Sequence, residues 1–116
     1  MLCHDLAAES IRLNPRKTAY LGNRAAAALK IAAQGGGKAK RFLRTASEDS
    51  ITAYTIDKSY KKAYLRAAEA HMLIGERHTV RLACKELQKA LNLDEDDQKV
   101  KGLLKEAQLE WEAEYA

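Results

Sequence analysis

Apolar residues recur at the spacing of one helix face along most of the chain, and this periodicity constrains the fold more than any other feature. Strict alternation of apolar and polar residues, which is typical of half-buried strands, occurs nowhere. The residues that interrupt helices are rare: there is one proline, Pro15, and three of the six glycines form the run 35–37. The 116 residues therefore predict one small all-α protein.

Six helical stretches are expected, each bounded by turn residues. The first ends before Pro15, because proline disfavours helix in the residue that precedes it. The glycine run ends the second stretch, Gly75 is expected to cap the fourth, and the acidic residues 94–97 suit the start of the last helix. The expected ranges are within 1–15, then 18–33, 38–56, 60–74, 80–91 and from residue 98 to near the end.

A short pattern occurs three times: a helix ends in an aliphatic residue, Asn or Asp follows, and a turn leads to a new helix. It is seen at Leu13-Asn14, Ile56-Asp57 and Leu93-Asp94. Small residues recur at matching places, namely Ala25 and Ala68, Ala46 and Ala83, and Ala53 and Ala90. In these features the chain resembles the tetratricopeptide repeat family, whose unit is a helix–turn–helix of about 34 residues. The resemblance implies a superhelix, or solenoid, of antiparallel helix pairs.

The resemblance covers essentially the whole chain and implies four parts. These are the second helix of an incomplete repeat (1–15), a repeat with an inserted turn (16–57), a further repeat (58–94) and a C-terminal capping helix (95–116). Both repeats are longer than the family's unit of about 34 residues, and the extra residues are expected in the turns 34–44 and 76–82. Because the first repeat lacks its first helix, the chain looks like a fragment, and uncovered Leu6, Ile11 and Leu13 would favour self-association.

One branch of the tetratricopeptide repeat family binds the extreme C-terminus of heat-shock chaperones, which ends Glu-Glu-Val-Asp, through a carboxylate clamp in a concave groove. The resemblance places Asn23, Lys62 and Arg66 at three of the five clamp positions. Residues four apart share a helix face, so Lys62 and Arg66 can meet one pair of carboxylates, and Asn23 supplies an amide donor. The same groove is expected to be lined by Ala19, Ala26, Lys30 and Glu69.

Two alternatives to the clamp stay open. The same fold could be a generic scaffold that binds another protein without recognising a free carboxylate. Nucleic-acid binding is the third hypothesis, but it has weak support because Phe42 alone is available for base stacking near the basic residues. The segment 103–110 also resembles the helix that leads into the J domain of tetratricopeptide-repeat J-domain co-chaperones, although the J domain itself is not in this sequence.

Charge is unevenly distributed along the chain. Residues 94–116 carry a net charge of −5, and the preceding residues carry +9. A basic cluster follows the glycine run. It could attract nucleic acid or lipid headgroups, but solvated charges at the start of a helix are the simpler interpretation. The cluster consists of Lys38, Lys40, Arg41 and Arg44.

No catalytic or metal-binding pattern is present. His4, His71 and His78 have no ligand partners at a suitable spacing, and the glycine run fails the Walker pattern because position 32 is alanine. We therefore expect no enzyme activity, no cofactor, no metal and no small-molecule substrate. Two cysteines, no apolar run of membrane length and acidic residues near the N-terminus predict a cytoplasmic protein with no membrane partner.

Overall fold

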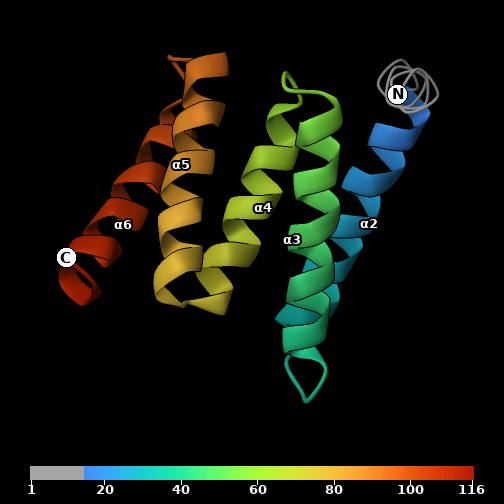
Figure 1. Cartoon of the computed structure of the whole chain (residues 1–116), viewed down its shortest axis with the longest axis horizontal. Helices are drawn as coiled ribbons and strands as arrows, with labels where there is room; N and C mark the ends of the chain where they lie inside the picture. Colours follow the sequence, from blue (N-terminus) through green and yellow to red (C-terminus); the bar gives the residue numbers. More distant parts are fainter. Residues whose placement is uncertain (1–14) are drawn as a thin grey trace, which may run out of the picture.

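The computed structural model of the chain describes residues 15–116, and all regular structure in this range is α-helical. The expected first helix, with Leu6, Ile11 and Leu13, lies outside these residues. The described helices are α2 (Pro15–Ala33), α3 (Ala39–Ile56), α4 (Lys61–Ile74), α5 (Arg77–Leu93) and α6 (Gln98–Glu114). Each helix packs antiparallel to its neighbour in chain order (Figure 1). The predicted all-α class and sequential packing of helices are confirmed.

Two helix starts differ from the prediction, each for a local reason. α2 begins at Pro15 rather than at residue 18, because proline is tolerated in the first turn, where its missing N–H has no intrahelical partner. α5 begins at Arg77 rather than at residue 80, because Glu76 and Thr79 form a reciprocal capping box. The backbone N–H of Glu76 donates to Thr79 Oγ1 at 3.0 Å. The usual order, with Ser or Thr first and Glu three residues later, is reversed here.

Two other helix ends agree with the prediction. Gly75 adopts the left-handed conformation with φ +69°, and its N–H donates to the carbonyl of His71 at the end of α4. At the start of α6, the Asp97 carboxylate accepts the backbone N–H groups of Lys99 and Val100 at 3.0 and 3.1 Å. The carboxylates predicted to favour this helix start therefore supply its cap.

The turns are shorter than the sequence suggested. α2 and α3 are joined by residues 34–38, and α4 and α5 are joined only by Gly75 and Glu76. Most of the residues expected in the turns 34–44 and 76–82 lie instead in the first turns of α3 and α5. These residues therefore extend helices, because continued backbone hydrogen bonding satisfies polar groups that a longer loop would expose.

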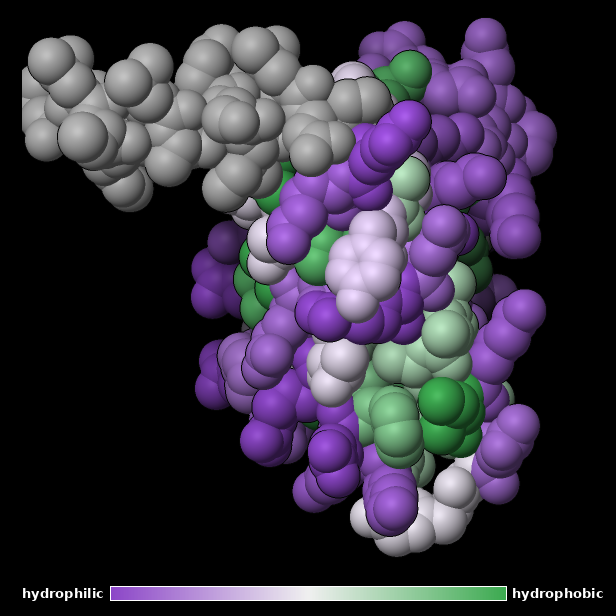
Figure 2. All heavy atoms as spheres, turned by 90° about the vertical axis from the view of Figure 1, so that its right-hand side faces the viewer, coloured by the Kyte–Doolittle hydropathy of each residue, from purple (hydrophilic) through white to green (hydrophobic). Residues whose placement is uncertain are grey.

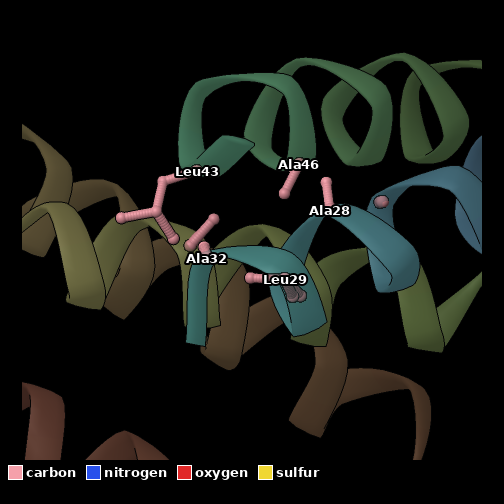
Figure 3. Packing of buried hydrophobic residues seen from close by; sticks show 7 residues of the cluster. Ala28, Leu29, Ala32, Leu43 and Ala46 are labelled. Atoms are coloured by element: carbon pink, nitrogen blue, oxygen red, sulfur yellow. The ribbon is translucent and has the colours of Figure 1, made fainter. Parts of the chain in front are cut away.

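Small residues dominate the contacts between helices. Figure 3 shows the cluster between α2 and α3, in which Ala28 and Ala32 of α2 lie near Leu43 and Ala46 of α3. The repeated small residues singled out in the sequence are all buried at 2% exposure or less. Alanine at these positions lets two helix backbones approach closely, and larger side chains would force them apart. No helix within residues 15–116 is long and apolar enough to cross a bilayer.

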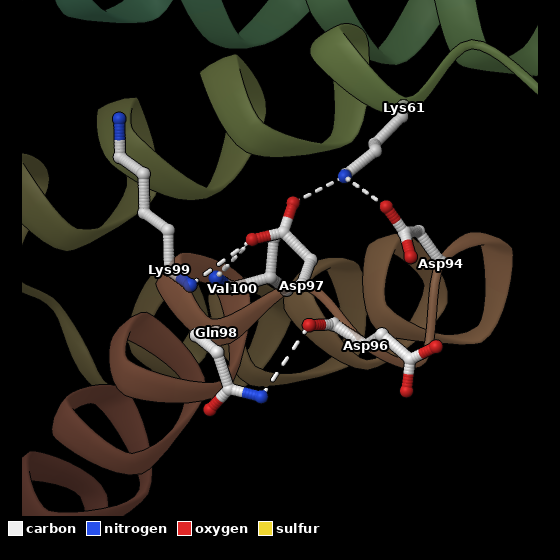
Figure 4. A network of polar contacts seen from close by, with 7 residues as sticks. All are labelled: Lys61, Asp94, Asp96, Asp97, Gln98, Lys99 and Val100. Carbon is white, nitrogen blue, oxygen red and sulfur yellow. Dashed lines mark hydrogen bonds and ion pairs between the residues drawn. The ribbon is translucent and has the colours of Figure 1, made fainter.

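Polar contacts add links between helices that the apolar core does not determine. Arg24 of α2 donates to both carboxylate oxygens of Asp49 in α3 at 2.6 and 2.8 Å. Figure 4 shows Lys61 of α4 bound to Asp94, at 3.3 Å, and to Asp97 in the turn before α6. The hydrogen bond with Asp97 raises the pKa of Lys61, and the same bond, with the Val100 N–H, lowers the pKa of Asp97.

A buried polar network joins α3, α4 and α5. The Tyr54 hydroxyl donates to one oxygen of Glu86 at 2.9 Å, and His71 Nδ1 lies 2.6 Å from the other oxygen. His71 and Glu86 are only 4% and 3% exposed. Burial and the neighbouring Glu86 carboxylate raise the pKa of Tyr54, so its hydroxyl stays a donor. The Tyr54 ring also stacks on Tyr64, with centroids 4.4 Å apart.

Candidate peptide-binding groove

Helices α2 and α4 contact each other although α3 lies between them in the sequence. Gly22 of α2 is buried and faces the start of α4. A Cβ atom there would collide with the Tyr60 hydroxyl and would lie 2.9 Å from Arg66 Nη1. Glycine at this position therefore allows α2 to approach the polar ends of the Tyr60 and Arg66 side chains. The sequence analysis selected Asn23 but not Gly22, since no contact between α2 and α4 can be read from helical periodicity.

The predicted groove residues of α2 form one stripe along the helix, at successive spacings of four, three and four residues. Ala19, Asn23 and Lys30 are exposed, and Ala26 is half-buried. Asn23, the second member of the stripe, directly follows Gly22, at which an added Cβ atom would lie 2.9 Å from Arg66 Nη1. Three of its four members are accessible to a ligand.

The predicted residues of α4 form the corresponding stripe. Lys62 and Glu69 are exposed, and Arg66 between them is half-buried. Arg66 Nη1 is buried and has no hydrogen-bond partner within the described part of the chain. An unpaired buried donor costs about 1–3 kcal/mol, and a charged donor costs more. This nitrogen is therefore a place where an added acceptor would stabilise the protein.

A cavity of about 350 Å³ lies between α4 and α6, with Leu87 of α5 at its base. Arg66 and Glu69 are the two predicted site residues in its wall, and the other five predicted residues do not line it. Most of the remaining wall is apolar. The apolar residues of the wall are Leu65, Ala68, Met72, Leu73, Leu87 and Leu103, and the other charged residues are Lys99 and Glu106.

The contribution of α6 was missed in the sequence analysis. Lys99, Leu103 and Glu106 follow the spacing of one helix face, which is the signal that could have identified them. The resemblance implies only a C-terminal capping helix for residues 95–116 and assigns no groove residue to it. The residues of α6 give the cavity a second cation, Lys99, opposite Arg66 of α4, and a second carboxylate, Glu106, in addition to Glu69.

The cavity combines accessible apolar surface with charge. Leu73 is 57% exposed and Leu103 is 36% exposed, which is high for leucine at a cavity wall. Charged groups of both signs lie beside these leucines. This combination suits a ligand that has apolar side chains and at least one charged group, such as a short peptide, better than it suits a purely ionic ligand.

His71 and His78, the histidines within the described residues, do not form a second site. His71 is part of the buried network with Glu86, and exposed His78 lies 3.7 Å from a Glu76 oxygen. No group of three or more potential metal ligands occurs within residues 15–116. His4 and Cys3 lie outside the described range. Cys84 is half-buried, and burial raises the pKa of its thiol, which lowers its reactivity.

Comparison of the chain with protein-family models gives no match, and comparison with curated proteins gives no match either. The sequence and the geometry described above are therefore the basis for assigning a function.

Proposed function

We propose that this protein is a peptide-binding module of the tetratricopeptide repeat type, a superhelix whose groove captures an acidic C-terminal peptide of the Glu-Glu-Val-Asp type from heat-shock chaperones. It would act as a co-chaperone domain without catalytic activity. The proposal rests on the residue resemblance together with three properties of the fold: sequential antiparallel helices, alanines at the helix contacts, and a groove lined by alternate helices.

The observation that carries the proposal is the position of Arg66. Its Nη1 is buried without a partner, and its side chain also lines an otherwise mainly apolar cavity. A peptide carboxylate in this cavity would form a charge-assisted hydrogen bond with the guanidinium group, whose pairing within the described residues is incomplete. An apolar side chain of the same peptide would cover Leu103 and Leu73, which are accessible in the free protein.

The alternative is a generic helical-repeat scaffold that binds another protein without a free carboxylate. One observation favours it: Asn23 and Lys62 do not line the cavity that contains Arg66. The three predicted clamp residues are thus not part of one enclosed site in the free protein. A partner could then be bound mainly through the leucines of α4 and α6.

A titration with a peptide ending in Glu-Glu-Val-Asp distinguishes these functions. We expect Arg66→Gln to weaken binding about tenfold, because hydrogen bonds to charged groups contribute about 1.5–3 kcal/mol. Arg81→Gln is the matched control, since Arg81 is exposed on α5 and does not line this cavity. Circular dichroism of each variant checks that the helices are intact.

The same peptide with an amidated C-terminus provides the second comparison. The clamp predicts that amidation weakens binding by a similar factor, since the terminal carboxylate is its main ligand. Equal binding of both peptides would favour the scaffold. Equal binding by the Arg66 and Arg81 variants would show that this cavity is not the peptide site.

A further inference from the structure

The α2–α3 turn and the helix ends beside it carry positive charge without any negative charge. The sequence has no Asp or Glu between Glu9 and Glu48. Five exposed cations lie around this turn, and we refer to them together as the basic tip. They are Lys30, Lys38, Lys40, Arg41 and Arg44. None of the five has an ion-pair partner in the part of the chain that the structure describes.

The basic tip is convex and open. In Figure 1 the α2–α3 turn extends beyond the α4–α5 turn at the same end of the molecule. A Cβ atom built on Gly35, Gly36 or Gly37 would meet no atom within 4 Å. Cations on such a protruding turn can approach a flat surface together, and none of the five lines the cavity between α4 and α6.

Apolar surface lies directly beside these cations. Ile31 is 41% exposed, and Ala27 and Ala33 on the same helix are also exposed. Figure 2 shows an apolar patch just above the lower end of the molecule, with hydrophilic side chains on both sides of it. Phe42 does not add an exposed ring, because it is half-buried and packs against the α2–α3 core.

The start of α3 lacks an anion that would match its dipole. Lys38 at the N-cap makes no side-chain hydrogen bond to the first turn, and this turn has no acidic residue. Lys40 and Arg41 follow immediately, so positive side chains lie where a helix favours negative charge. An external anion would relieve this arrangement.

We propose that the basic tip docks on the surface of an anionic lipid bilayer, with its cations at the headgroups and Ile31 at the polar–apolar boundary. Three properties favour a bilayer over nucleic acid: the tip is convex, exposed aliphatic surface adjoins the charge, and no exposed aromatic ring lies near the turn for base stacking. None of the five cations lines the cavity between α4 and α6. The basic tip shares only Lys30 with the predicted groove stripe of α2, so Lys38 and Lys40 test membrane contact separately from peptide binding.

Vesicle sedimentation of the full chain tests the proposal. The probe is a phosphatidylcholine vesicle with 30% phosphatidylserine, compared with phosphatidylcholine alone, at low and moderate salt. Each neutralised cation should weaken binding about fivefold, because a Lys or Arg near an anionic membrane contributes about 1 kcal/mol. The double variant Lys38→Gln/Lys40→Gln should therefore bind about 25-fold more weakly.

The control is Lys89→Gln/Lys101→Gln, which removes the same charge from exposed positions on α5 and α6. We expect this control variant to retain most of its binding to the anionic vesicles. In a separate test, Ile31→Ser leaves the charge unchanged and should bind the vesicles a few-fold more weakly than the unmodified chain. Three results would overturn the proposal: no binding to anionic vesicles at low salt, equal losses in the two double variants, or tighter binding to a mixed-sequence DNA duplex than to the vesicles.

Discussion

The two helical hairpins, α2–α3 and α4–α5, are closed by different means. The α4–α5 turn consists of Gly75 in the left-handed conformation and Glu76, which forms a capping box with Thr79. The α2–α3 turn has five residues, includes three glycines and ends at Lys38, whose side chain caps nothing. Both turns contain backbone hydrogen bonds, such as that from the Gly35 N–H to the Ala32 carbonyl in the first hairpin. Only the second hairpin has side-chain caps at the start of its second helix, and the first also relies on its apolar core and on the Arg24–Asp49 pair.

This difference matters for function. A helix start without a side-chain cap opens more readily than one held by a capping box, so we expect the basic tip to be the more adaptable end of the molecule. The α4–α5 hairpin instead supplies the rigid wall and base of the candidate groove, through Arg66 and Leu87. Four changes would test the comparison, starting with the largest expected effect.

Glu86→Ala should cause the largest loss of stability, because it leaves the buried His71 and the half-buried Tyr54 without their shared partner. We expect a decrease of about 3 kcal/mol in the free energy of unfolding, measured by urea denaturation. Asp49→Ala is the comparison in the first hairpin, and it should cost clearly less because Arg24 is half-exposed and can be solvated. Equal losses would contradict the distinction between the hairpins.

Gly75→Ala should have the next largest effect. The φ of +69° is unfavourable for any residue with a Cβ, so we expect a loss of about 1 kcal/mol in thermal or chemical unfolding. Gly75→Asn is a suitable control, since asparagine tolerates this conformation better than alanine does. If alanine and asparagine were equivalent here, the left-handed cap would not be what closes this hairpin.

Gly37→Ala should have a small effect of opposite sign. Gly37 lacks a positive φ, and an added Cβ would meet nothing within 4 Å. The substitution therefore restricts mainly the unfolded chain and should stabilise the protein by about 0.4 kcal/mol. A clear destabilisation in the same unfolding assay would mean that the α2–α3 turn is more tightly constrained than its open geometry indicates.

The smallest effect concerns pH at the start of α6. The pKa of Asp97 is lowered below its ordinary value of 3.8, so its contribution to stability is present above that pH and is lost as pH falls through the lower folded value. The pKa of Lys61 is raised above 10.5, so its contribution is lost only as pH rises beyond that value. Lys61→Met should reduce the dependence of the free energy of unfolding on pH in the acidic range. If that dependence were unchanged, Lys61 and Asp97 would not be coupled.

The sequence alone determined the helical class and most helix boundaries. Periodicity, the glycine run and Gly75 predicted the ends of α2, α3 and α4 within one residue, because these signals act through local backbone geometry. Local chemistry also predicted that the last helix starts directly after the acidic residues 94–97, as α6 does at Gln98. It failed at Arg77, where Glu76 and Thr79 form the capping box in reversed order.

Only the tertiary structure decided which helix faces meet. Sequence spacing placed Lys62, Arg66 and Glu69 on one face of α4, but it could not show that Arg66 reaches Gly22 or that α6 completes the cavity. Likewise, His71 and Tyr54 were unremarkable until packing placed both beside Glu86. Helix formation depends on residues within one or two turns, whereas a binding site depends on contacts between helices far apart in the chain, and these contacts are set by packing.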